Sequence, residues 1–124
     1  MMWAQLTIAL SGVGVLLTGW LALAFLRDPV AGMATATHQA EKLPQVMTDR
    51  YIGFTVLALG ATLYGDMAVI AGLFAVFAFM GFADAWIYAR DGFPFSKHLG
   101  AGLAALAVVA AALAAIIFSG EGSV

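Results

Sequence analysis

Residues Met67–Tyr88 read MAVIAGLFAVFAFMGFADAWIY and contain one charged side chain, that of Asp84. A helix needs about 20 apolar residues to cross the hydrocarbon core of a bilayer, which is about 30 Å thick. The stretch therefore predicts a transmembrane helix with a carboxylate near its end. The composition agrees: 64% of the 124 residues are hydrophobic, 10% are charged, and the mean hydropathy is +1.01, whereas soluble domains carry about 25% charged residues.

Three further segments complete the predicted fold. Gln5–Leu26 and His98–Phe118 are long enough to cross a bilayer. Tyr51–Gly65 is apolar but spans only about 22 Å as a helix, so we extend it back toward Pro44, a favourable first-turn residue. We predict an all-α fold, a four-transmembrane-helix up-down-up-down bundle. It forms a single transmembrane domain, 1–124, with helices at about 5–26, 45–65, 67–90 and 97–118 and a cytoplasmic loop at 27–44.

The basic residues predict an orientation for this bundle. With four crossings, all five of them fall on one side of the membrane: Arg27, Lys42, Arg50, Arg90 and Lys97. Basic residues are enriched in cytoplasmic loops. We expect a protein integral to the inner membrane, with both termini outside and the basic loops in the cytoplasm. Within the first loop, apolar residues recur at roughly helical spacing from Val30 to Leu43, which favours a short helix on the membrane surface.

The same composition excludes several classes of function. The chain has no cysteine, so disulfides and thiolate chemistry are excluded. Two histidines, His38 and His98, argue against a multi-histidine metal site, and no motif for a cofactor is present. No basic stripe exists to hold a nucleic acid. The partners we expect are membrane lipids, with other membrane subunits or further copies of the chain as alternatives.

Asp84 needs a partner, because an unpaired charge at membrane depth costs several kcal/mol. Counted from the turn at Asp66, Asp84 lies about 27 Å along its helix and Arg50 about 24 Å along the preceding one. Adjacent antiparallel helices would place the two at nearly equal depth. The planar guanidinium of arginine suits two-point contact with a carboxylate. We therefore predict an ion pair between Arg50 and Asp84.

Other polar residues fall near this pair. Tyr88 lies four residues after Asp84 and shares its helix face, and Gly81, three residues before it, leaves room there. His98 begins the next predicted helix. The candidate ligand-binding residues are Arg50, Tyr51, Asp84, Tyr88 and His98, and the candidate catalytic residues are Asp84 and His98. In the competing interpretation, the ion pair only fixes the register of the helices.

The segments DRYIGFTVLALG, GFADAWI and HLGAG resemble a family of small four-helix membrane proteins, bacterial and fungal, that is catalogued only as a domain of unknown function. The matching positions lie between Asp49 and Phe118: Arg50, Gly53, Gly60, Gly81, Asp84, Ala85, His98 and Gly100. The first helix and loop match poorly. The resemblance implies a four-helix fold and supports the choice of site residues, but it implies no reaction.

Three functions stay open at this point. The first is a cytoplasmic-side site at Arg50, Asp84 and His98 that binds a small amphiphilic or lipid-like ligand or does acid–base chemistry on it. The second is an accessory subunit that packs against a larger membrane complex. The third is a proton-coupled small-molecule exporter, which ranks last because Gln5–Leu26 carries no charge. The sequence does not decide whether the protein is an enzyme.

Overall fold

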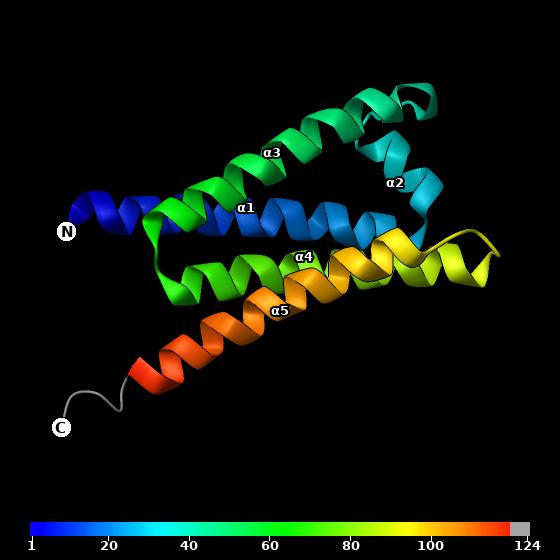
Figure 1. The fold of residues 1–124 in the computed structure, drawn as a ribbon. Coiled ribbons are helices and arrows are strands. Elements are labelled where there is room, and N and C mark those ends of the chain that lie inside the picture. Colours follow the sequence, from blue (N-terminus) through cyan, green and yellow to red (C-terminus); the bar gives the residue numbers. More distant parts are fainter. Residues whose placement is uncertain (120–124) are drawn as a thin grey trace. The chain divides into compact units, whose positions relative to one another are not determined.

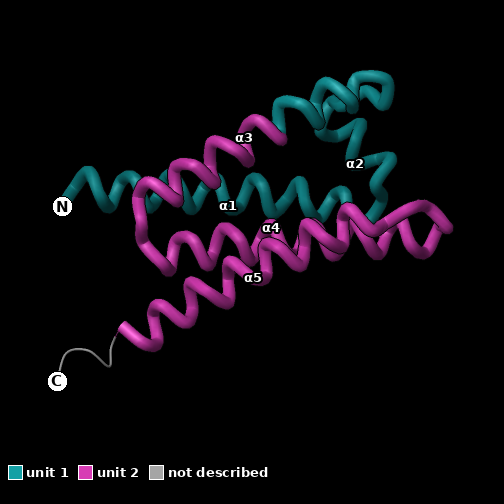
Figure 2. The backbone as a smooth tube through the Cα atoms, viewed as in Figure 1, with its two compact units in different colours: residues 1–50 teal, residues 51–124 magenta. Residues whose placement is uncertain are grey.

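The computed structural model describes residues 1–119, which form helices joined by short turns, with no strand among them. The elements are α1 (Met2–Arg27), α2 (Pro29–Thr35), the short 3₁₀ helix η1 (Ala40–Lys42), α3 (Leu43–Tyr64), α4 (Met67–Arg90) and α5 (Ser96–Ser119) (Figure 1). The chain divides into two compact units, unit 1 (Met1–Arg50) and unit 2 (Tyr51–Val124), and their boundary falls within α3 (Figure 2).

Three helices of the described residues are long and apolar enough to cross a membrane: α1, α4 and α5. The prediction of a four-transmembrane-helix bundle is therefore wrong. The helix α3 does extend back to Leu43, but the added turns, LPQVMTDR, bring in Asp49, Arg50 and other polar groups. The apolar remainder, residues 51–64, spans only about 21 Å, which is short of a hydrocarbon core about 30 Å thick.

Unit 1 is built around the junction between α1 and α2. Asp28 ends α1 and caps α2, because its carboxylate accepts hydrogen bonds from the backbone N–H groups of Val30 (3.0 Å) and Ala31 (3.1 Å). Gly32 lies against Phe25: a Cβ added at Gly32 would be 2.8 Å from Cγ of the ring. No residue of α1 is buried. The predicted surface helix in the first loop corresponds to α2, which is shorter than expected.

Unit 2 is organised by the packing of α4 against α5, which run side by side in Figure 1. Every buried residue of these two helices is alanine or glycine, and most recur at intervals of seven. They are Ala71, Ala78, Gly81 and Ala85 on α4, and Gly102, Ala105 and Ala112 on α5. Small residues let helix backbones approach closely where lipid removes the hydrophobic driving force. We call this set the alanine–glycine seam.

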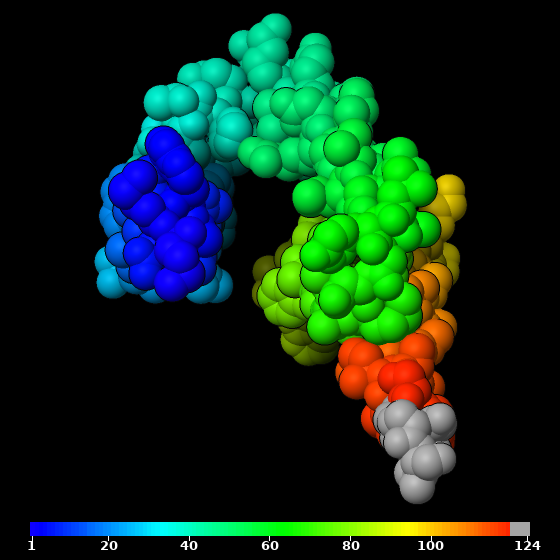
Figure 3. Space-filling view, turned by 90° about the vertical axis from the view of Figure 1, so that its left-hand side faces the viewer, coloured from blue at the N-terminus to red at the C-terminus, as the bar shows by residue number. Residues whose placement is uncertain are grey.

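The apolar part of α3, residues 51–64, completes unit 2 and lies alongside α4 and α5 (green in Figure 3). The rings of Phe54 and Phe77 meet with centroids 5.6 Å apart. The turn into α4 uses Gly65, whose φ is +76°, and Asp66, whose carboxylate accepts a hydrogen bond from the backbone N–H of Val69 at 3.0 Å. This turn places α3 and α4 against one another near the cavity described below.

Candidate functional site

Asp84 of α4 and His98 of α5 face one another. Nδ1 of His98 lies 3.7 Å from Oδ2 of Asp84, and the two side chains are 31% and 47% exposed, respectively. The separation is too long for a hydrogen bond. The contact is thus an ion pair when the imidazole is protonated and a weak dipolar contact when it is neutral.

The alanine–glycine seam positions this pair. Gly81 lies three residues before Asp84, and Gly102 lies four residues after His98, so each glycine is about one turn from the pair. A Cβ added at Gly81 would be 2.7 Å from the backbone N of Gly102 and 3.1 Å from the carbonyl oxygen of His98. The two backbones therefore touch beside the pair, and this contact fixes the distance between the imidazole and the carboxylate. The room that Gly81 was expected to leave is filled by the backbone of α5.

Tyr88 holds the imidazole from its other side. The rings of Tyr88 and His98 are stacked, with centroids 4.7 Å apart and planes 22° apart. Phe93, from the loop between α4 and α5, contacts the edge of Tyr88, with centroids 6.2 Å apart. The stack restricts rotation of the His98 ring and directs Nδ1 toward Asp84. Tyr88 itself does not line the neighbouring cavity.

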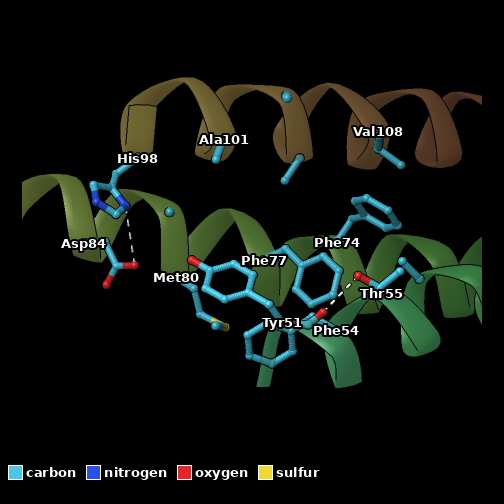
Figure 4. Close-up of a pocket in the computed structure, with 14 residues that line it drawn as sticks. Tyr51, Phe54, Thr55, Phe74, Phe77, Met80, Asp84, His98, Ala101 and Val108 are labelled. Atoms are coloured by element: carbon cyan, nitrogen blue, oxygen red, sulfur yellow. Dashed lines mark hydrogen bonds and ion pairs between the residues drawn. The ribbon is translucent and has the colours of Figure 1, made fainter. Parts of the chain in front are cut away.

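A cavity of about 420 Å³ opens next to the pair, between residues 51–58 of α3 and the helices α4 and α5. Asp84 and His98 lie at one end of it, and the hydroxyl of Tyr51 points toward the same end (Figure 4). The rest of its wall is mainly apolar and includes the rings of Phe54, Phe74 and Phe77. The cavity is therefore polar at one end and mostly apolar along its length.

Arg50 lies in unit 1, and its nearest polar side-chain partner there is histidine. Nη2 of Arg50 is 3.4 Å from Nε2 of His38; Arg50 is exposed and His38 is half-buried. The predicted ion pair between Arg50 and Asp84 joins residues of different units, and it stays a prediction. Sequence reasoning missed the contact with His38, because it depends on a turn in which Thr37 takes a φ of +59°, a conformation rare for a β-branched residue.

Sequence reasoning also missed the aromatic wall of the cavity, although a signal was present. Phe74, Phe77, Gly81, Asp84 and Tyr88 follow one another at intervals of three or four residues along α4. Such spacing places them on one helix face. Extending the Asp84 face back along α4 by about two turns would have found Phe77, and by about three turns Phe74.

The geometry favours acid–base contact over metal binding. Within residues 1–119, no group of three or more histidine, aspartate or glutamate side chains could hold a metal ion. Histidine is the side chain that most readily changes charge between about pH 5 and 8. The pair can therefore hold a proton or release it to a bound group.

Comparison with known proteins identified no relative of this chain. No family model, no curated protein and no solved structure matches the chain. The resemblance to the four-helix family of unknown function is thus still a prediction, and any function must be argued from the site itself.

Proposed function

We propose that this protein is an integral membrane protein that binds a single-chain amphiphile in the cavity of unit 2. One observation carries the proposal: the cavity has Asp84, His98 and the Tyr51 hydroxyl at one end and mainly apolar side chains along the rest. The one hydroxyl in that remainder, on Thr55, is already hydrogen-bonded to the carbonyl oxygen of Tyr51. An amphiphile has the same division, with a polar head and an apolar tail. The volume of the cavity, about 420 Å³, lies within the range of roughly 300–1,000 Å³ typical of small-molecule sites.

The position of the polar end supports the same ligand class. Asp84 lies six residues before the end of α4, and His98 is the third residue of α5. Asp84 is therefore about 9 Å and His98 about 3 Å from the helix ends that meet at the loop, near the depth of lipid head groups. A ligand with its head at this level would have its tail among the phenylalanines deeper in the bilayer.

Binding is proposed here rather than catalysis. Acid–base catalysis needs a reacting group within about 2.6–3.2 Å of the histidine or the carboxylate. To hold a head group by its charge, Asp84 and His98 do not need a reacting atom at that distance. Asp84 and His98 remain the residues that would carry any proton transfer.

The three apolar helices support a membrane location for the protein. We propose that it is integral to the inner membrane and that α1, α4 and α5 are the helices that cross it.

The binding proposal is tested by filling the cavity. Ala104 lines it, whereas Ala110, also exposed, lies on the opposite side of α5. Purified protein in maltoside micelles should bind a radiolabelled, uncharged alkyl polyoxyethylene ether. Ala104→Trp should abolish saturable binding, and Ala110→Trp should leave it unchanged. Equal binding by the two variants would remove the proposed function.

The accessory-subunit function is the second candidate, because within unit 1 none of the 26 residues of α1 is buried. A Cβ at Gly12, Gly14 or Gly19 would meet nothing within 4 Å. These glycines would suit close packing against a helix of another chain. Stoichiometric co-purification of a second membrane protein in mild detergent, lost on Gly12→Leu, would favour this candidate.

A further inference from the structure

We infer that the head group taken by this cavity is cationic, and that it competes with the proton on His98 for the Asp84 carboxylate. The inference rests on the proposed amphiphile-binding function and names the ligand class: a lipophilic cation with a single chain. It follows from the charges that line the cavity, from the carboxylate of Asp84, which accepts no hydrogen bond within residues 1–119, and from the side chain of Tyr51.

The charges favour a cation over an anion. The lining residues include one carboxylate, Asp84, and one imidazole, His98, with no lysine or arginine among them. When His98 is neutral, the polar end therefore carries one negative charge. An anionic head would meet this carboxylate at close range, where like charges repel, whereas a cationic head would neutralise it.

The Asp84 carboxylate has capacity for such a partner. No hydrogen bond to it is formed within residues 1–119, and its nearest cationic neighbour in unit 2 is Nδ1 of His98 at 3.7 Å. The side chain is 47% exposed. A carboxylate in a membrane-spanning segment is costly without a counter-charge, so a bound cation would stabilise the charged form of Asp84.

The hydroxyl of Tyr51 agrees with this preference. Tyr51 lines the cavity, and its hydroxyl end lies toward Asp84 and Met80 (Figure 4). The phenol oxygen has lone pairs that can face a cation. A cationic head at the carboxylate thus has a second oxygen atom on its side of the cavity.

The proton on His98 and the cation are alternative partners of Asp84. In the protonated state, the imidazolium neutralises the carboxylate. When a cation binds, the imidazolium loses its proton to water, and the cation takes its place, so the net charge of the site is unchanged. The titratable groups that face His98 are Asp84 and Tyr88 from α4, and Tyr51 is the one on α3 that lines the same cavity.

The experiment compares three amphiphiles of equal chain length in uncharged maltoside micelles: an alkyltrimethylammonium, an alkyl polyoxyethylene ether and an alkyl sulfonate. We expect the ammonium to bind about three- to tenfold more tightly than the ether, as for a partly exposed charge pair, and the sulfonate to bind most weakly. Equal binding of ammonium and ether would overturn the inference and leave the proposed function standing. Preference for the sulfonate would also overturn it and would favour an arginine in the site. Failure of all three to bind would remove the proposed function as well.

Two variants and a pH series test the competition. Asp84→Asn should abolish the preference for ammonium over ether, and Asp91→Asn, a carboxylate at the same helix end that pairs with Arg90 at 3.9 Å, should leave this preference unchanged. Ammonium binding should weaken as the pH falls from about 8 to 5, the range in which histidine gains its proton. In His98→Gln the pH dependence should vanish. Persistence of the pH dependence in His98→Gln, or of the ammonium preference in Asp84→Asn, would overturn the inference.

Discussion

The helix α1 and the hairpin of α4 and α5 have similar amino-acid compositions but pack differently. All three helices are long, apolar and rich in glycine and alanine. Within unit 1, the glycines of α1, Gly12, Gly14 and Gly19, have open space beside them, whereas within unit 2 Gly81 and Gly102 lie in contact with the partner helix. Small residues permit two helices to pack closely, but only where a second helix lies next to them.

The connection between the helices supplies that partner. Only residues 91–95 separate α4 from α5, so the two helices are held at a high effective concentration. In contrast, α1 is followed by α2, a helix of seven residues that contacts only its end. The packing of a glycine-rich helix is thus decided by what the chain places next to it.

The largest effect is expected at the closest contact of the hairpin. Gly81→Ala places a Cβ 2.7 Å from a backbone atom of Gly102, which cannot move without separating the helices. We expect a loss of about 1–3 kcal/mol in the free energy of unfolding, as for an overpacked core. Thermal unfolding in maltoside micelles measures it. The matched control is Gly72→Ala on the same helix, where nothing lies within 4 Å; a similar loss in both variants would contradict close packing at Gly81.

The loop of the hairpin comes next. Gly92 has a φ of +77°, and Gly92→Ala would hold a residue with a side chain in the left-handed region at a cost of about 1 kcal/mol. The same unfolding measurement should show this loss. Asparagine tolerates this region better than alanine, so Gly92→Asn should recover part of the loss. No difference between the two variants would mean that the loop does not hold the hairpin in this conformation.

A smaller loss is expected at Gly102. Its added Cβ would lie 2.9 Å from Cδ1 of Phe82, an atom of a side chain that can rotate away. We expect Gly102→Ala to cost about 0.5–1 kcal/mol, the strain of an off-rotamer ring, with Gly100→Ala, which has open space, as the control. A loss at Gly102 larger than that at Gly81 would reverse the ranking of backbone over side-chain contacts.

The smallest effect, with the opposite sign, is expected in α1. Gly14→Ala meets no neighbour and replaces a poor helix former by a good one, so helix stability should rise by about 0.5 kcal/mol. The readout is again the unfolding midpoint in micelles. Should Gly14→Ala destabilise the protein, α1 would have a packing partner after all, and the contrast with the hairpin would fail.

The sequence predicted the parts of this molecule that depend on local pattern. The apolar run after Asp66 gave the bounds of α4, residues 67–90, and helical spacing placed Tyr88 beside Asp84. Because the following loop is short, His98 was expected near them, and it lies against both. The membrane character follows from composition in the same way.

Other features depend on contacts that no local pattern records. The polar first turns of α3 looked acceptable at membrane depth only because Arg50 and Asp84 were expected to neutralise one another. Counting residues from a turn gives depth along a helix, but it does not give the direction in which a side chain extends. The contact of Arg50 with His38 requires a turn at Thr37 that hydropathy does not reveal. The cavity similarly requires the relative placement of three helices.

The alanine–glycine seam has a consequence for entropy. Fixing a side chain in one rotamer costs up to about 2 kcal/mol for long residues, but nothing for alanine or glycine. The seam itself therefore forms without any loss of side-chain rotamers. The flexible side chains that are fixed between α4 and α5 flank it: Phe82 lies against Gly102, and His98 is stacked on Tyr88.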